Sequence, residues 1–180
     1  MTCIVGIAHK GKVYLGGDSA GVSGLDITVR KDKKVFSNGE FVMGFTSSFR
    51  MGQILQYTFE PPEVAMDDDD LMAYMVKKFI PAIRKTFKDE GYTAIESNRE
   101  KGGCFLVGVR GRLFQIDSDF QVGEHLNGMA AVGCGEAYAY GSLFAQQNTK
   151  ADAADKVEKA LEAAAFFSGG VVAPFNFVHN

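Results

Sequence analysis

Short apolar strands joined by tight turns are the feature of this 180-residue chain that most restricts its fold. The runs 4–8 and 13–17 flank a turn at 9–12, so they predict a hairpin that begins almost at the start of the chain. The runs 34–37 and 41–44 flank Asn38-Gly39, the strongest short-range hairpin signal. Strands in consecutive pairs favour antiparallel sheets, because parallel strands need a long crossover between them.

Helical periodicity and further apolar runs fill the rest of the chain. The segments predicted as helices are 48–59, 67–88, 136–147 and 151–167. The segments predicted as further strands are 103–109, 113–117, 129–132 and 171–178. Asp67 to Asp70 suit the positive end of the second helix, and Pro81 is expected to kink that helix. This order predicts an α+β fold with antiparallel sheets and segregated helices, in a single domain over 1–180.

Charge and composition exclude several classes of function. The net charge of −3 gives no basic field for nucleic acid, and no apolar run approaches the ~20 residues of a membrane span. The three histidines form no metal-ligand pair. The cysteines are odd in number and far apart, which favours a reducing cytoplasmic compartment. They are Cys3, Cys104 and Cys134.

Two local motifs resemble ligand-binding loops, but each lacks a residue that such a loop needs. Gly133-Cys134-Gly135 lies between a predicted strand and a predicted helix, as a dinucleotide loop would, but the third glycine of that fingerprint is replaced by Tyr138. The four aspartates at 67–70 lack the alternating spacing and the glycine of a calcium loop.

The start of the chain offers a nucleophile together with its own base. A threonine hydroxyl is a weak nucleophile near neutral pH and requires a base within hydrogen-bond reach. An α-amino group has an ordinary pKa of about 7.7–8.0, close to the value that suits a general base. Removal of Met1 would give Thr2 both groups on one residue.

Four short motifs resemble those of proteasome β subunits and, more closely, those of the bacterial ring protease HslV. They are Thr2-Cys3-Ile4-Val5-Gly6, Gly16-Gly17-Asp18-Ser19, Lys33-Lys34-Val35 and Met43-Gly44-Phe45-Thr46. Asp18 follows Thr2 by sixteen residues and Lys34 follows it by thirty-two, as in that family. The resemblance extends over most of the chain in element order, and over about the first fifty residues in motif.

This resemblance to N-terminal-nucleophile hydrolases implies a role for each matching residue. Thr2 would attack the peptide carbonyl, and its amine would carry the proton. Lys34 would lower the pKa of that amine and favour the ionised hydroxyl, and Asp18 would orient Lys34. The backbone N–H of Gly44 would stabilise the oxyanion. Val42 is expected to form one wall of an apolar specificity pocket.

Two positions depart from the pattern of the family. Cys134 stands where the family has a serine that assists the threonine amine, and a thiol is a weaker hydrogen-bond partner. Ser168 is retained, but Ala165 stands where an aspartate is its usual companion. These departures bear on the rate of the reaction and on whether the site is active.

The resemblance also implies an overall architecture and partners. The fold would be a four-layer αββα sandwich of two antiparallel sheets flanked by helix pairs. The protein would be a threonine peptidase that cleaves peptides or unfolded proteins and needs no metal or other cofactor. Unlike many proteasome β subunits, it is expected to carry no propeptide before the threonine. It would assemble into a homo-oligomeric ring fed by an ATP-driven (AAA+) unfoldase. Two alternatives stay open: a non-catalytic ring or scaffold subunit of the same fold, and an amidase acting on small amides.

Overall fold

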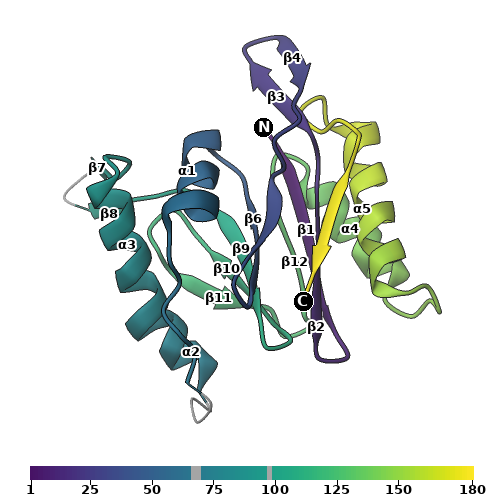
Figure 1. Cartoon of the computed structure of the whole chain (residues 1–180). Coiled ribbons are helices and arrows are strands. Elements are labelled where there is room, and N and C mark those ends of the chain that lie inside the picture. Colours follow the sequence, from purple (N-terminus) through teal and green to yellow (C-terminus); the bar gives the residue numbers. More distant parts are fainter. Residues whose placement is uncertain (66–69, 97–98) are drawn as a thin grey trace.

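Two antiparallel sheets lie at the centre of the computed structural model, which describes residues 1–65, 70–96 and 99–180 (Figure 1). The first sheet has the order β12 (Met129–Gly133), β1 (Cys3–His9), β2 (Lys12–Gly17) and β13 (Asn176–His179). The second has the order β11 (Val122–Glu124), β10 (Arg112–Ile116), β9 (Phe105–Val109), β6 (Phe41–Phe45) and β5 (Val35–Asn38). The predicted hairpins are therefore the neighbouring pairs β1–β2, β5–β6 and β9–β10.

Helices cover the outer face of each sheet (Figure 1). The first sheet carries α4 (Glu136–Gln146) and α5 (Ala153–Phe167). The second carries α1 (Phe49–Gln53), which continues into the π-helical turn η1 (Ile54–Thr58), and a longer helix made of α2 (Leu71–Tyr74), the π-helical turn η2 (Met75–Phe79) and α3 (Ile80–Asp89). This arrangement confirms the predicted four-layer αββα sandwich.

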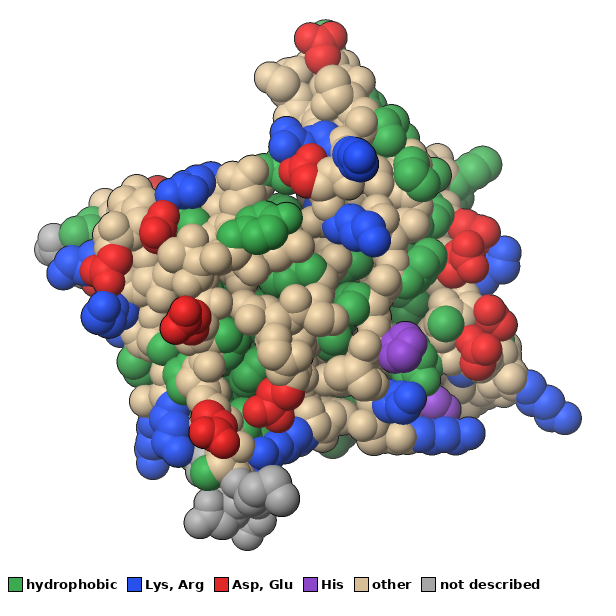
Figure 2. Space-filling model, in the orientation of Figure 1, with side chains coloured by type: hydrophobic (Ala, Val, Ile, Leu, Met, Phe, Trp, Pro, Cys, Tyr) green, Lys and Arg blue, Asp and Glu red, His purple; other side chains and the backbone are tan. Residues whose placement is uncertain are grey.

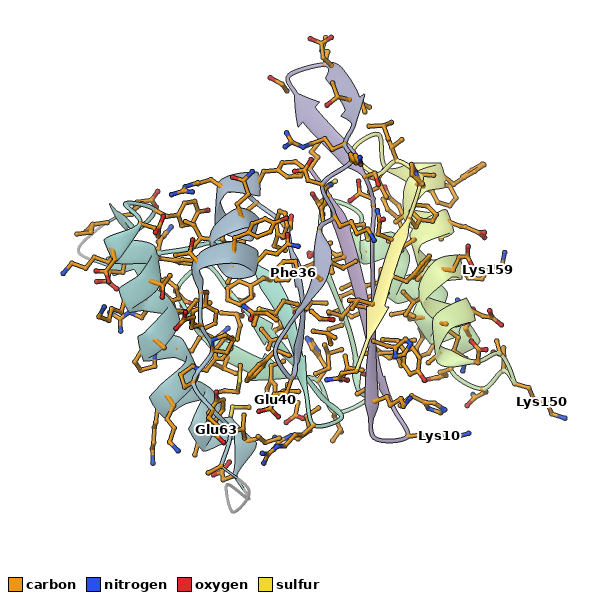
Figure 3. The ribbon with its side chains drawn as sticks, in the orientation of Figure 1. Lys10, Phe36, Glu40, Glu63, Lys150 and Lys159 are labelled. Atoms are coloured by element: carbon orange, nitrogen blue, oxygen red, sulfur yellow. The ribbon has the colours of Figure 1, made fainter. Side chains whose placement is uncertain are left out.

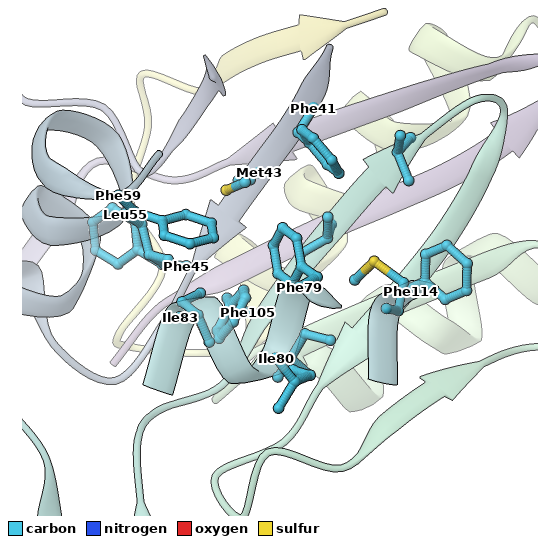
Figure 4. Close-up of a cluster of buried hydrophobic side chains, with 14 of the residues drawn as sticks. Phe41, Met43, Phe45, Leu55, Phe59, Phe79, Ile80, Ile83, Phe105 and Phe114 are labelled. Carbon is cyan, nitrogen blue, oxygen red and sulfur yellow. The ribbon is translucent and has the colours of Figure 1, made fainter. Parts of the chain in front are cut away.

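Three apolar layers hold the four layers together. Phenylalanines dominate the layer between the second sheet and its helices, where Phe41, Phe45, Phe79 and Phe114 pack among aliphatic side chains (Figure 4). The layer between the sheets is aliphatic, and the layer under α4 and α5 is rich in alanine. Figure 3 shows the contrast with the periphery, where Lys10, Lys150 and Lys159 extend away from the ribbon.

The structure contains strands that the sequence did not predict. A hairpin of β3 (Ala20–Ser23) and β4 (Asp26–Val29) projects beyond the end of the sandwich at which the N-terminus lies (Figures 1 and 2). A second small hairpin comprises β7 (Ala94–Glu96) and β8 (Arg99–Lys101), and β11 adds an edge strand. Residues in β4 and β7 are exposed, so they lack the apolar alternation that signals a half-buried strand.

Two further predictions differ from the structure in detail. The last strand begins at Asn176 and not at 171, because residues 171–175 form the loop that leads from α5. The π-helical turn η2 comes directly before Ile80 and Pro81, so the helix accommodates the proline with a local change of hydrogen bonding. The predicted start of this helix at Asp67 lies outside the described residues, and Asp70 caps α2 through a bond from the Ala73 N–H.

Candidate active site

Three residues far apart in sequence meet at the start of β1. Thr2 precedes β1, Asp18 follows β2, and Lys34 precedes β5, so hairpin pairing and sheet packing bring them to one end of the sandwich. All three are buried, with exposed fractions of 4%, 0% and 1% respectively. The structure therefore assembles the three residues whose spacing had drawn attention to them.

The Lys34 ammonium group links the other two side chains. Its Nζ donates to Thr2 Oγ1 at 2.9 Å and to Asp18 Oδ1 at 2.9 Å. The first bond places a cation against the oxygen that would become the nucleophile, and the second pairs the cation with a carboxylate in a buried ion pair.

Backbone donors fix the Asp18 carboxylate in turn. Oδ1 accepts the Cys3 N–H at 3.0 Å, and Oδ2 accepts the Ala20 N–H at 2.8 Å and the Val172 N–H at 3.4 Å. These donors satisfy the lone pairs that Lys34 leaves free, so the buried charge is compensated on every side. Asp18 thus orients Lys34 from a rigid position.

Burial and charge act in opposite directions on Lys34. Desolvation is the larger effect and lowers the pKa of the Lys34 ammonium below its ordinary value, while the charge and hydrogen bond of Asp18 raise it. The same burial raises the pKa of the neighbouring Cys3 thiol to about 12, so that thiol is neutral and unreactive.

Cys134 and Ser168 complete the polar surroundings of Thr2. The Thr2 N–H donates to Cys134 Sγ at 3.3 Å, and the Ser168 hydroxyl donates to the same sulfur at 3.4 Å. With Met1 in place, the Thr2 nitrogen is an amide, and the Thr2 hydroxyl donates to the Met1 carbonyl. Ala165, at the position of the missing acid, packs in the apolar layer between α5 and the first sheet.

Gly133 keeps the Thr2 backbone in place. Its φ is +106°, and a Cβ there would lie 2.2 Å from the Thr2 carbonyl oxygen. A side chain at this position is excluded by both backbone conformation and space. The close approach of β12 to residue 2 also brings Cys134, the next residue, against the Thr2 nitrogen.

Gly44 does not lie where the resemblance implied. It is an internal residue of β6 and pairs with Leu106 of β9, two residues before the bond from the Thr46 N–H to the Cys104 carbonyl. Alternation along an antiparallel ladder directs the Gly44 N–H to the same neighbouring strand, away from the cleft beside Thr2. The expected oxyanion role of Gly44 is therefore corrected.

Val42 is corrected for a related reason. Its exposed fraction is 1%, and it packs in the aliphatic layer between the two sheets. Side chains alternate along a strand, and the even-numbered positions 42 and 44 of β6 face the opposite sheet. Val42 supports the sandwich and does not line the cleft at Thr2.

The cleft at Thr2 is lined instead by the segment that follows β6. Its volume is about 70 Å³, and its lining residues are Met1, Thr2, Val22, Phe45, Thr46, Ser47, Ser48 and Phe49. Ser47 has a φ of +72°, a conformation that non-glycine residues seldom adopt. In the described part of the chain the Ser47 N–H has no hydrogen-bond partner, whereas the N–H groups on either side of it are bonded. A serine gives no sequence signal for this geometry.

Neither a cluster of potential metal ligands nor a helix able to span a membrane occurs among the residues described. No three histidine, cysteine or carboxylate side chains there lie together as metal ligands would. Within the same ranges, no helix is long and apolar enough to cross a bilayer.

Comparison with known proteins identifies the fold through structures only. No protein-family model matches the chain, and no curated protein matches its sequence. Thiobacillus denitrificans BPH in complex with epoxomicin superposes with a TM-score of 0.82 at 20% identity, covering 99% of this chain and 98% of that one. BPH without that ligand gives 0.81 at 20% identity, with 99% and 97% covered.

A eukaryotic protein gives a third structural match. HslV from Trypanosoma brucei superposes with a TM-score of 0.72 at 17% identity, covering 99% of this chain and 98% of that one. The matches span the whole chain, and they agree with the sheet order and the helix pairs described above. The chain therefore has the Ntn-hydrolase fold of the proteasome type, shared with BPH and HslV.

Proposed function

We propose that this protein is a threonine peptidase that uses Thr2 as its nucleophile once Met1 has been removed. The observation that carries the proposal is the bond from Lys34 Nζ to Thr2 Oγ1 at 2.9 Å, inside a buried cluster that Asp18 orients. A structural ion pair alone would not need a third hydroxyl partner at the end of the chain. Buried ion pairs at such a site are the usual means of tuning a nucleophile.

The reaction proceeds in two acyl transfers. Thr2 Oγ attacks the peptide carbonyl carbon while the free Thr2 amine accepts the hydroxyl proton. The C–N bond breaks, the leaving amine takes that proton, and an ester on Thr2 remains. Water then attacks the ester with the amine again as base, which releases the acid and restores the hydroxyl. Lys34 stabilises the charge that develops on Oγ and, as a neighbouring cation, lowers the pKa of the amine.

The Ser47 N–H takes the place of Gly44 as oxyanion donor in this proposal. It is unbonded, it belongs to the residues that line the cleft with Thr2, and the positive φ of Ser47 holds it in a conformation that the strand does not impose. A preorganised donor of this kind contributes about 10²–10³ in rate.

Cys134 and Ser168 position the Thr2 amine. The sulfur already accepts from the Thr2 nitrogen, and the same contact would hold the free amine after Met1 is lost. Since Ala165 supplies no acid, the amine depends on this sulfur and on Ser168 for its orientation.

Processing, labelling and turnover together test the assignment. Mass spectrometry of the purified protein establishes whether Met1 is absent. Epoxomicin, with which BPH was crystallised, should add to the processed chain at Thr2 and raise its mass by one equivalent. A fluorogenic peptide should be cleaved by the processed form, and Thr2→Ala should lose both properties while keeping its fold. Cleavage retained in that variant would refute the proposal.

The assembly and compartment follow from the same resemblance. We expect a homo-oligomeric ring in the cytoplasm that receives unfolded protein from an ATP-driven (AAA+) unfoldase, with no cofactor in the chemistry. Native mass measurement distinguishes this from the small amidase, which would be an open monomer or dimer. A processed ring without peptidase activity would favour the scaffold subunit instead.

A further inference from the structure

Phe49 separates the cleft at Thr2 from the space behind it. Three hollows meet at this ring: the cleft of about 70 Å³ at Thr2, a cavity of about 150 Å³ over α1, and one of about 200 Å³ beside the β3–β4 hairpin. Among the described residues, Phe49 is the one that lines all three. The position of its ring therefore determines how much room lies next to the nucleophile.

Three contacts surround the Phe49 ring, and in one of them the Lys34 Nζ lies 5.6 Å from the ring centroid. The Arg30 guanidinium carbon lies 3.9 Å from the ring centroid, and two hydrogen bonds of 2.8 Å to Asp32 fix that guanidinium. The Phe45 ring meets it edge-on, with centroids 5.7 Å apart. A stacked cation and a perpendicular ring together favour one orientation of Phe49.

Phe45 forms the immobile part of the same wall. It is buried, with 4% of its surface exposed, and a Cβ on Gly52 would lie 2.1–2.4 Å from its ring atoms. The ring is thus seated directly on the backbone of α1, which blocks its movement in that direction. Phe49 is only half-buried, so it alone in this wall has a route outward.

The room beside Thr2 limits the substrate side chain that precedes the scissile bond. Loss of Met1 enlarges the cleft on the side of Cys134 and Gly170, where Met1 packs, and leaves the wall of Phe45 and Phe49 unchanged. The carbonyl carbon under attack must lie against Thr2 Oγ, and the cleft beside Thr2 is bounded by Phe45 and Phe49 and has a volume of about 70 Å³. A substrate side chain that enters this cleft from the acyl side has room for only a few atoms before it reaches the Phe49 ring.

We propose that Phe49 makes this enzyme selective for small side chains, such as glycine, alanine and serine, on the acyl side of the cleaved bond. The inference rests on the proposed peptidase function and names its substrate class. Leucine and phenylalanine are rejected because they fit only if Phe49 leaves its place between Arg30 and Phe45. The 150 Å³ cavity behind the ring holds such side chains once the barrier is removed.

The test compares peptides that differ only in that residue. Processed wild-type protein should cleave the alanine peptide with kcat/KM at least about tenfold above the leucine and phenylalanine peptides. Phe49→Ala joins the cleft to the cavity, so the order should reverse, with a rise of about tenfold or more for leucine. Tyr57→Ala is the matched control, because Tyr57 lines the same cavity without lining the cleft.

A second variant keeps the test decisive if Phe49→Ala is unstable. Arg30→Gln removes the stacked cation and leaves the Phe49 ring, so it should relax selectivity in the same direction by a smaller factor. Equal cleavage of the alanine and leucine peptides by wild-type protein, or unchanged selectivity in both variants, overturns the inference and leaves the peptidase assignment intact. Absence of cleavage of every peptide by processed protein counts against the peptidase assignment itself.

Discussion

Lys34 Nζ lies 2.9 Å from Thr2 Oγ1, although the two residues are thirty-two positions apart in the chain. The ammonium group is almost completely buried, and its other partner is the Asp18 carboxylate. A cation in that position stabilises a negative charge on the threonine oxygen. It also lowers the pKa of an amine on the same threonine, because two positive charges repel each other. The first two predictions concern this pair of groups.

Lys34→Met should lower peptidase activity by about 10² or more, because no other cation contacts the nucleophile oxygen among the residues described. It should also destabilise the fold by about 3 kcal/mol, since Asp18 is left as an unpaired buried charge. The double variant Asp18→Asn, Lys34→Met removes both buried charges but places an amide NH₂ against a backbone N–H, so it should recover part of the stability and none of the activity. Denaturant unfolding and peptide hydrolysis measure the two effects separately. Equal recovery of both would show that Lys34 acts only through stability.

Asp18→Asn alone should change the pH dependence of the reaction. Asp18 raises the pKa of Lys34, while burial lowers it. Removing the carboxylate takes away the largest of the effects that raise this pKa, so Lys34 loses its proton at lower pH. Activity, which requires the charged lysine, should then decline on the alkaline side at a lower pH than in wild-type protein. Profiles of kcat/KM against pH for both proteins provide the measurement. An alkaline decline at the same pH in both proteins would contradict the prediction.

Cys134→Ser should retain or raise activity, because a hydroxyl is a better hydrogen-bond partner for the Thr2 nitrogen than a thiol. Cys134→Val, similar in size and without a polar atom, should lose activity through the misplaced amine while the fold persists. A thiol-alkylating reagent should inactivate wild-type protein and spare Cys134→Ser. Loss of activity in the serine variant would mean that the sulfur has a role beyond positioning.

The buried thiol of Cys3 should make stability depend on alkaline pH. Its pKa is about 12 in the folded protein against 9.0 as an ordinary thiol, so the protonated form is favoured by folding. This contribution is complete below pH 9.0 and is lost as pH rises towards about 12, because only the unfolded thiol ionises in that window. The free energy of unfolding should fall by up to about 1.4 kcal/mol per pH unit relative to Cys3→Ala. Parallel curves for the two proteins would exclude the effect.

Gly133→Ala should destabilise the protein by at least about 2 kcal/mol, since the added Cβ meets the Thr2 carbonyl and the residue has a positive φ. Gly141→Ala is the matched control. Gly141 lies in α4, a Cβ there has nothing within 4 Å, and the substitution should stabilise the helix by about 0.5–1 kcal/mol. Thermal unfolding of both variants measures the expected loss of stability in Gly133→Ala and the expected gain in Gly141→Ala.

The sequence predicted the candidate site best for residues that lie at the ends of strands. The spacings from Thr2 to Asp18 and to Lys34 match those of the family that the motifs resemble, and the three residues do lie together. The grouping of strands predicted the antiparallel sheets, and the resemblance predicted the two covering layers of helices. In each case a local sequence pattern defines the strands, and pairing of the strands in the sheet then brings distant residues together.

Sequence reasoning failed where the direction of a backbone group decides its role. Gly44 and Val42 belong to the expected strand, but their direction depends on the ladder with β9 and on the facing of β6, which spacing does not reveal. Ser47 is a loop serine whose importance comes from a backbone angle and an unbonded N–H. The β3–β4 hairpin was missed because its residues face solvent and carry no alternation.

The three backbone donors to Asp18 come from Cys3 in β1, Ala20 at the start of β3, and Val172 in the loop after α5. Synthesis proceeds from the N-terminus, so the last of these donors emerges from the ribosome only after α4 and α5 have been made. A nascent chain that has not reached Val172 lacks one of the donors that hold the Asp18 carboxylate beside Lys34. The buried cluster is therefore complete only after the segment that follows α5 has been synthesised.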